Sequence, residues 1–208
     1  MGYTSAAMEI RRPAQDDPIQ RFLALLERAR ATPQITEPTA MTLATVNAEG
    51  RPSARVVLLK GADEDGLVFY TNLQSRKAKE ALARREVALV FWWAPLESQV
   101  RFEGRAERVS DEEAEAYFAT RPRGSQLGAW ASAQSDPLGS RAELEAKLVE
   151  VTDKFEGVPV PRPPHWSGIR VRPTAVEFWK NRPNRLHERE LYTREKQGAP
   201  WFVQLLNP

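Results

Sequence analysis

The 208-residue sequence contains no cysteine and only two histidines, His165 and His187. The absence of thiols excludes disulfides, iron–sulfur clusters and thiolate metal sites. Two histidines are too few to favour a zinc or non-haem iron site built from imidazoles, so we expect no metal. No apolar run approaches the roughly 18 residues of a membrane span, and the N-terminus lacks the apolar region of a signal peptide. We therefore expect a cytoplasmic protein that does not bind membranes.

Charged residues are plentiful but nearly balanced in sign. The 30 basic and 28 acidic residues leave a formal net charge of +2, and 23 of the basic residues are arginine. Arginine presents a planar fork that matches carboxylate and phosphate oxygens, although genomic base composition can produce the same bias. Acidic residues are interspersed almost everywhere and no basic block stands out, which argues against a nucleic-acid partner.

The length of the chain suits one domain with a sizeable core. Residues 1–16 are polar without periodicity, and we expect them to be mobile. Asp17-Pro18 resembles a helix start, with Asp as the cap and Pro at the first helical position. We therefore expect a single domain over residues 17–208.

The hydrophobic period from Ala40 to Ser110 is that of β-strands, and short strand patterns return near the C-terminus. We expect strands over residues 40–46, 52–60, 67–71, 87–93, 99–109, 169–171, 175–179, 185–192 and 201–206. Capping residues predict helices that begin at Ser75, Ser110 and Ser140. This pattern indicates an α+β protein built on a mostly antiparallel β-barrel. The usual nucleotide-binding folds are disfavoured, because the chain has no Gly-x-Gly-x-x-Gly motif, P-loop or nucleophile elbow.

Two groups of cations suggest anion sites. Ser75-Arg76-Lys77 places two cations at a helix N-terminus, where they oppose the macrodipole unless an anion binds the backbone N–H groups there. A solvated helix start is the alternative. Arg55 and Lys60 lie five residues apart on one predicted strand, so they face opposite sides about 16 Å apart. They would serve two anions or two ends of one long ligand, or simply flank a buried strand.

Tyr117, Arg121 and Ser125 form a third group. Tyr117 and Arg121 share a helix face at i, i+4, and Pro122 ends that helix so that Ser125 begins the next one. A phenol, a guanidinium and a helix-start serine can converge on a phosphate, although surface capping explains the same residues.

The C-terminal region carries a cluster of side chains that suit a ligand. If residues 185–192 are extended, Arg185, His187 and Arg189 point to one face of the strand. Two guanidiniums and an imidazole, with the Trp179 indole six residues upstream, suit a flat anionic ligand. An edge strand decorated with charge is the alternative.

Together these motifs resemble the pyridoxine/pyridoxamine 5'-phosphate oxidase family. The family's C-terminal signature, Glu-Phe-Trp followed at fixed spacing by Arg-Leu-His-acid-Arg, stands here as Glu177-Phe178-Trp179 and Arg185-Leu186-His187-Glu188-Arg189. The resemblance runs from about Thr39 to the C-terminus. Its other pieces are Arg55–Lys60, Phe69-Tyr70-Thr71-Asn72, Ser75-Arg76-Lys77, Gln99, Tyr117 with Arg121-Pro122-Arg123, and Gln134-Ser135.

The resemblance implies a split β-barrel, Greek-key-like with peripheral helices, that assembles as a homodimer and holds FMN at the subunit interface. The positions that match the family's FMN contacts are Arg55, Val56, Lys60, Tyr70, Thr71, Arg76, Lys77, Gln99, Gln134, Ser135, Trp179 and Arg189. Lys60, Tyr117, Arg121 and Ser125 match the positions that hold the substrate phosphate. The positions over the substrate's pyridine ring are matched by Arg185 and His187. We expect Arg185 to align the substrate and stabilise developing charge, with His187 as a secondary polar partner.

The implied reaction oxidises pyridoxine or pyridoxamine 5'-phosphate to pyridoxal 5'-phosphate, a step of vitamin B6 metabolism. The substrate gives hydride to the flavin, and oxygen reoxidises the flavin with release of hydrogen peroxide. One alternative is a phenazine-pathway oxidase of the same family, which acts on a bulkier tricyclic substrate and typically loses parts of the phosphate cluster. The other is a split-barrel protein that binds flavin, haem or pyridoxal phosphate without turnover. Retention of the phosphate cluster and of Arg185 and His187 favours the vitamin B6 reaction.

The sequence departs from the family pattern in three places. An arginine pair that often precedes an N-terminal tyrosine is missing, and only Met1-Gly2-Tyr3 remains. The usual ending Arg-Leu-Ala-Pro is Leu205-Leu206-Asn207-Pro208, and Lys180 stands where Gln is more usual. These changes bear on the expected substrate rather than on the expected flavin.

Overall fold

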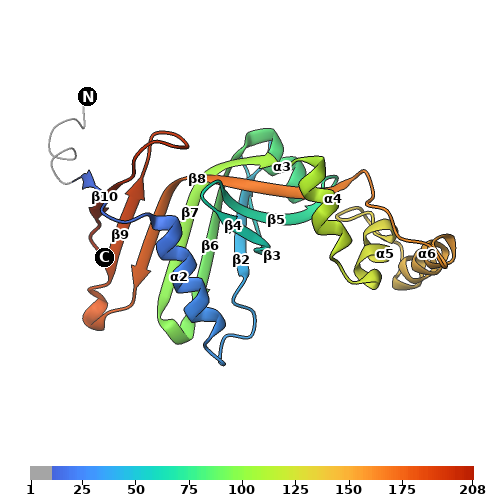
Figure 1. Ribbon diagram of the computed structural model, residues 1–208, viewed down its shortest axis with the longest axis horizontal. Helices are drawn as coiled ribbons and strands as arrows, with labels where there is room; N and C mark the ends of the chain where they lie inside the picture. The colour runs from blue at the N-terminus through green and yellow to red at the C-terminus, as the bar shows by residue number, and fades with distance from the viewer. Residues whose placement is uncertain (1–10) are drawn as a thin grey trace.

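The computed structural model describes residues 11–208, which build one antiparallel sheet with helices around it (Figure 1). The strands are β1 (Arg12–Pro13), β2 (Ala40–Val46), β3 (Pro52–Leu58), β4 (Gly61–Asp63), β5 (Gly66–Asn72), β6 (Glu86–Trp93), β7 (Ser98–Arg108), β8 (Trp166–Lys180), β9 (Glu188–Thr193) and β10 (Phe202–Leu205). Their order is β1-β10-β9-β8-β7-β6-β2-β3, and β5 pairs with both β4 and β8. The expected α+β class with an antiparallel sheet is confirmed.

All α-helices of residues 11–208 but one begin where capping residues predict them to begin. The predicted start at Ser125 is wrong, because that helix begins at Arg123, directly after Pro122. The helix before it ends at Ala119, so Arg121 lies beyond its end and does not share a helix face with Tyr117.

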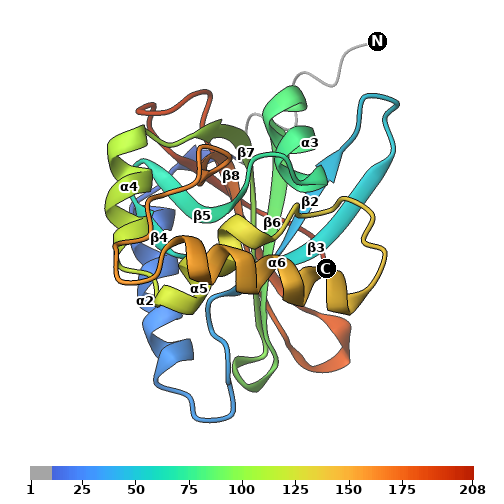
Figure 2. The same cartoon turned by 90° about the vertical axis from the view of Figure 1, so that its right-hand side faces the viewer.

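The helices are α2 (Pro18–Arg30), α3 (Arg76–Arg84), α4 (Asp111–Ala119), α5 (Arg123–Ala131) and α6 (Arg141–Lys154). The side chains of Asp17, Ser75, Ser110 and Ser140 accept hydrogen bonds from backbone N–H groups in the first turns of α2, α3, α4 and α6. Figures 1 and 2 show α4, α5 and α6 gathered at the end of the molecule opposite β9 and β10. Along residues 11–208 no helix has both the length and the apolar character needed to cross a membrane.

Helix α2 covers the sheet through the apolar stripe that its sequence shows. Its buried residues Ile19, Phe22 and Leu26 recur at helical spacing. The Phe22 ring lies 5.0 Å from the Phe91 ring on β6 and 4.9 Å from the Phe102 ring on β7. Each of these rings is fully buried, and burial of such a side chain contributes about 1.5–3 kcal/mol. This contact fixes α2 across the central strands.

Strand β8 is the longest element of the sheet, although its sequence predicts two short strands. Its first half pairs with β5, its second half pairs with β9, and β7 follows it along almost its whole length. Pro173, which reads as a strand break, lies where the β7–β8 register shifts between Glu103 and Gly104. A Cβ atom on Gly104 would lie 2.2 Å from the Arg172 carbonyl oxygen, so only glycine fits. At this bulge β8 leaves one partner strand for another.

Strand β3 ends two residues earlier than its sequence predicts. It stops at Leu58, and the Lys60 N–H donates to the Val68 carbonyl at 2.8 Å. The chain then turns back through β4, whose residue Asp63 pairs with Gly66 in the hairpin that the sequence predicts. Lys60 therefore lies outside the strand of Arg55, and the expected alternation of faces does not fix its direction.

The predicted strand over residues 185–192 is wrong at its start. β9 begins at Glu188, and Pro183–Arg185 forms the 3-10 turn η2, in which Asn184 (φ 57°) and Arg185 (φ 65°) have left-handed backbone. Pro183 has no backbone N–H to donate to a neighbouring strand, and asparagine adopts left-handed backbone more readily than most residues. Pro183 and Asn184 therefore favour a turn. Neither Arg185 nor His187 belongs to the strand, and alternation of faces does not align them with Arg189.

The segment expected to be mobile, residues 1–16, lies partly outside the described residues, and so does Tyr3. In the part that is described, Arg12 pairs with Val203 and Pro13 pairs with Phe202, which places β1 at the edge of the sheet beside β10. These pairings give residues 12 and 13 a defined position on the sheet.

Candidate functional site

A cavity of about 500 Å³ opens between β3, β5 and the helices α3, α4 and α5. Its lining includes nine positions singled out in the sequence: Val56, Lys60, Tyr70, Thr71, Lys77, Tyr117, Arg121, Ser125 and Gln134. These residues come from five separate segments, and only the folded chain brings them together. The lining also includes Trp166, the first residue of β8, which belongs to none of the sequence motifs described above.

Arg121 is one of the charged residues that line this cavity. Its guanidinium lies 4.6 Å from the centre of the Trp166 ring and 5.5 Å from that of Phe118. Burial lowers the pKa of Arg121, which the Tyr117 hydroxyl partly opposes, yet an arginine remains charged. Within residues 11–208 its buried Nη1 has no hydrogen-bond partner. A buried charged donor without a partner costs free energy, so this position favours an anion.

A stack of aromatic rings lines the same cavity. The rings of Tyr70 and Tyr117 are 3.9 Å apart and nearly parallel, and the Trp166 ring lies 5.2 Å from Tyr70. Gly168 makes room for the stack, because a Cβ atom there would lie 2.8 Å from the Tyr70 ring. Burial, reinforced by the charge of Glu113, raises the pKa of Tyr70 to about 12. The Tyr70 hydroxyl therefore keeps its proton at neutral pH and can donate a hydrogen bond.

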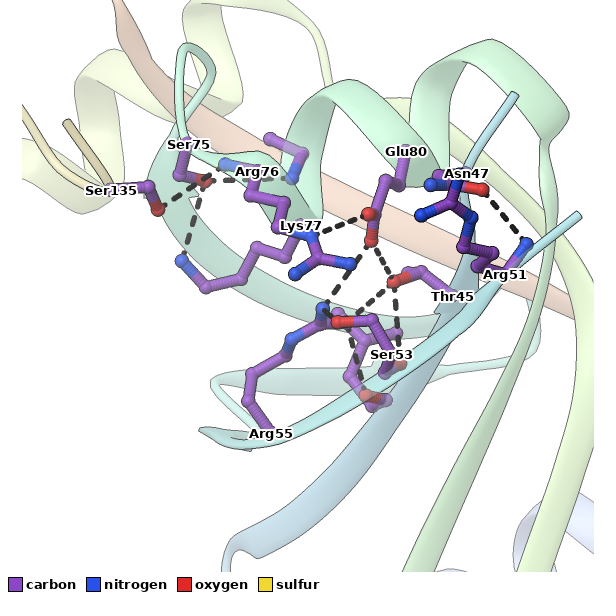
Figure 3. Close-up of polar contacts among 12 residues, drawn as sticks. Thr45, Asn47, Arg51, Ser53, Arg55, Ser75, Arg76, Lys77, Glu80 and Ser135 are labelled. Carbon is purple, nitrogen blue, oxygen red and sulfur yellow. Dashed lines mark hydrogen bonds and ion pairs between the residues drawn. The ribbon is translucent and has the colours of Figure 1, made fainter. Parts of the chain in front are cut away.

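The N-terminus of α3 is fastened to the loop that follows α5. Lys77 Nζ donates to Gln134 Oε1 at 2.8 Å and to the hydroxyls of Thr71 and Ser75. The backbone N–H of Arg76, which occupies the first position of α3, donates to Ser135 Oγ at 3.2 Å (Figure 3). Burial lowers the pKa of Lys77, and the charge of the nearby Arg55 lowers it further. The cations expected from the sequence thus lie around a helix N-terminus, where positive charge adds to the helix dipole.

Arg55 lies in this group of cations, whereas Lys60 lines the same cavity as Arg121 and Lys77. Arg55 Nη1 donates to Thr45 Oγ1 at 2.6 Å, and Nη2 lies 3.4 Å from Glu80 Oε2. Glu80, a buried carboxylate, was not singled out in the sequence. Its position four residues after Arg76 on a predicted helix was the available signal, because side chains at i and i+4 meet.

The residues of the C-terminal signature form a second group at the other end of β8. Trp179 pairs with Gln99 on β7 and with Arg189 on β9. The Trp179 ring lies 4.5 Å from the His187 ring, and Arg189 Nε donates to Glu177 Oε1 at 2.8 Å. A cavity of about 330 Å³ lies beside Gln99 and Trp179.

Arg185 and His187, which the η2 turn positions, differ in whether another residue holds the side chain. His187 Nδ1 accepts a hydrogen bond from the Arg182 backbone N–H at 3.3 Å. In the neutral imidazole the proton therefore resides on Nε2, which can donate to a ligand. Arg185 is exposed, and no hydrogen bond joins its side chain to another residue in the described part of the chain.

The two groups do not meet within one chain. Trp166 lines the first cavity and Trp179 lines the second, and no residue lines both. These tryptophans are 13 residues apart on β8 (179 − 166), which is roughly 40 Å along a strand that rises about 3.3 Å per residue. A site that includes all the residues predicted from the sequence therefore requires two copies of the chain.

Comparison with known proteins identifies both parts of the chain. Residues 27–155 match the family described as pyridoxamine 5'-phosphate oxidase, and residues 166–208 match the pyridoxine 5'-phosphate oxidase C-terminal dimerisation region. The pyridoxine/pyridoxamine 5'-phosphate oxidase of Myxococcus xanthus DK1622 is 58% identical over 192 residues, which is 92% of each chain. That of Rubrobacter xylanophilus is 60% identical over 195 residues, or 94% of this chain and 88% of the relative.

A solved structure is also similar to this chain. PhzG from Burkholderia lata 383, in complex with tetrahydrophenazine-1-carboxylic acid, superposes with a TM-score of 0.82 and 32% identity over 92% of this chain and 91% of that one. The similarity confirms the expected split-barrel fold, and the dimerisation region supports the expected homodimer. By its family matches, its relatives and its fold, the chain belongs to the pyridoxamine 5'-phosphate oxidase family.

Proposed function

We propose that the protein is an FMN-dependent oxidase that converts pyridoxine 5'-phosphate and pyridoxamine 5'-phosphate to pyridoxal 5'-phosphate. The observation that carries this proposal is the buried, unpartnered Nη1 of Arg121 within the described residues, in a cavity that Lys60, Tyr117 and Ser125 also line. Two cations and two hydroxyls in one cavity suit a phosphate ester, which carries up to two negative charges and accepts charge-assisted hydrogen bonds.

The residues around the N-terminus of α3 fit the phosphate of FMN. Arg55, Arg76 and Lys77 supply positive charge, and the helix N-terminus adds its backbone dipole. Arg76 donates to Glu80 through Nε only, and within residues 11–208 both of its Nη groups lack partners. The aromatic wall of Tyr70 suits a flat ring system beside that phosphate.

A homodimer would supply the remaining contacts. Trp179, Gln99 and Arg189 of one chain would complete the flavin site formed by residues of the other chain. The expected contacts from that other chain are Arg55, Val56, Lys60, Tyr70, Thr71, Arg76, Lys77, Gln134 and Ser135. This arrangement accounts for the distance along β8 between the two groups.

In the proposed reaction FMN supplies the two-electron redox chemistry, with oxygen as the final acceptor and hydrogen peroxide as the second product. The side chains of this protein bind and orient the substrate. Lys60, Tyr117, Arg121 and Ser125 hold its phosphate. Arg185 remains charged near neutral pH, so it is a poor proton acceptor. We assign it to aligning the substrate ring and stabilising developing charge, with His187 donating through Nε2.

A phenazine-pathway-type oxidation is the second candidate, and the similarity to PhzG favours it. A purified, FMN-loaded protein separates the two. The proposal expects oxygen-dependent formation of pyridoxal 5'-phosphate from both phosphorylated vitamers and little from free pyridoxine. Turnover of a reduced phenazine carboxylic acid without turnover of either vitamer would favour the second candidate. A protein that binds FMN but oxidises none of these compounds would be a flavin-binding protein without turnover. A cytoplasmic location and the absence of nucleic-acid or membrane partners stay predictions.

A further inference from the structure

Glu80 is a buried carboxylate with no role in the proposed reaction, yet it lies at the centre of the cation group. Its side chain is only 7% exposed. Oε1 accepts from Arg76 Nε at 2.7 Å, and Oε2 accepts from Thr45 Oγ1 at 2.6 Å and lies 3.4 Å from Arg55 Nη2. Figure 3 shows dashed lines that join the carboxylate to both guanidiniums. A carboxylate with both oxygens paired in this way is held in one orientation.

The charges in this group leave an excess that matches a phosphate monoester. Arg55, Arg76 and Lys77 contribute three positive charges and Glu80 one negative charge, which leaves +2. Burial by itself would raise the pKa of Glu80, but hydrogen bonds from Thr45 and Arg76 outweigh burial and lower it. Glu80 is therefore ionised at neutral pH. A phosphate monoester carries −1.5 to −2 at that pH, so bound FMN would bring the group close to neutrality.

The two arginines differ in the donors that remain for a ligand. Arg55 already donates through both of its Nη groups; the acceptors are Leu43, Thr45, Ser53 and Glu80. Within residues 11–208, therefore, only its Nε–H remains to bind a ligand. Arg76 has its Nε on Glu80, and no described residue accepts from its two Nη groups. Since the Arg76 side chain is 60% exposed, Glu80 is what fixes its direction.

We propose that Glu80 is a positioning residue for the cofactor phosphate: it holds Arg76 and Arg55 so that the Nη groups of Arg76 face the phosphate of FMN. This inference rests on the proposed function, because it takes the anion at the N-terminus of α3 to be that of FMN. Without Glu80, Arg76 would have to be ordered by the ligand itself. The lost entropy of a long side chain corresponds to about a tenfold loss of affinity.

The charge of Glu80, taken alone, predicts the opposite effect on FMN affinity. Replacing Glu80 by an uncharged residue removes a negative charge near the phosphate, which by Coulomb's law would strengthen FMN binding. If Glu80 instead positions Arg76, the same replacement should weaken FMN binding, and only ligands that carry a phosphate should be affected. Riboflavin has the same ring system as FMN without the phosphate, so it measures any damage to the rest of the site.

The test compares FMN and riboflavin binding to the flavin-free protein, by flavin fluorescence titration, for the unmodified chain, Glu80→Gln and Glu145→Gln. Glu145 is the matched control, because its Oε1 accepts from Arg141 Nε at 2.8 Å with the same i, i+4 spacing on the exposed helix α6. We expect Glu80→Gln to weaken FMN binding about tenfold and to change riboflavin binding less than twofold. Glu145→Gln should change neither.

Each other outcome counts against the inference. Tighter FMN binding by Glu80→Gln would show that the charge of Glu80, rather than its position, matters. Unchanged FMN binding would show that Glu80 does not position the residues that bind the phosphate. Equal weakening for FMN and riboflavin would show that Glu80 only supports the fold. If the unmodified protein binds FMN no better than riboflavin, the proposed phosphate site itself is wrong, and the inference is wrong with it.

Discussion

Replacing Arg121 by methionine should impair oxidation of the phosphate ester and spare oxidation of the free alcohol. Methionine keeps the length and the apolar stem that pack against the rings of Trp166 and Phe118. It removes the guanidinium whose buried Nη1 has no partner in the described part of the chain. One charge-assisted hydrogen bond contributes about 1.5–3 kcal/mol, which corresponds to a loss of roughly 10- to 150-fold in kcat/KM for the ester.

The folded state should survive this change, because the lost cation–π contacts are worth about 0.5–2 kcal/mol and the cost of burying an unpaired charge disappears with them. The assay measures kcat/KM for pyridoxine 5'-phosphate and for free pyridoxine at saturating FMN. Arg123→Met is the matched control. That neighbouring guanidinium donates to the carbonyls of Phe155 and Val158 and does not line the cavity. Equal losses for ester and alcohol would refute the reasoning, since they would show that Arg121 does not bind phosphate.

Four further predictions address the flavin, the dimer and two side chains. Purified protein should be yellow and release about one FMN per chain on denaturation; a colourless protein that takes up no FMN would contradict this. Light scattering should show a homodimer whose dissociation loses flavin, and a flavin-loaded monomer would exclude the shared site. Arg185→Met should keep FMN and lose roughly ten- to hundredfold in turnover, whereas normal turnover would make Arg185 structural. Because burial and Arg55 lower the pKa of Lys77, its amine should react with acylating reagents at a lower pH than ordinary lysine. FMN, an anion that favours the charged amine, should move that reaction profile to higher pH, as read by mass spectrometry, and an unmoved profile would place the phosphate elsewhere.

The local sequence was sufficient to predict most elements and the chemistry of the side chains. Caps such as Asp17 and Ser75 act within one helical turn, so their effect can be read without the rest of the fold. The two-residue alternation of β2 (Ala40–Val46) reflects one buried face, and its observed bounds agree with those predicted. The cations of Arg55, Arg76 and Lys77 indicated an anion for the same reason, since charge is a property of the residue itself.

Only the tertiary structure decided how distant segments combine. The strand β8 continues past Pro173 because a bulge in β8 itself, opposite Glu103 and Gly104 of its neighbour β7, accommodates the proline. That neighbour is chosen by long-range pairing. The direction of Arg185 depends on the left-handed backbone of the η2 turn, which alternation along a strand cannot express. Glu80 meets Thr45 and Arg55 only because α3 lies across β2 and β3. Burial, register and pairing depend on the whole chain, so the separation of the two site halves along β8 also became visible only in the folded protein.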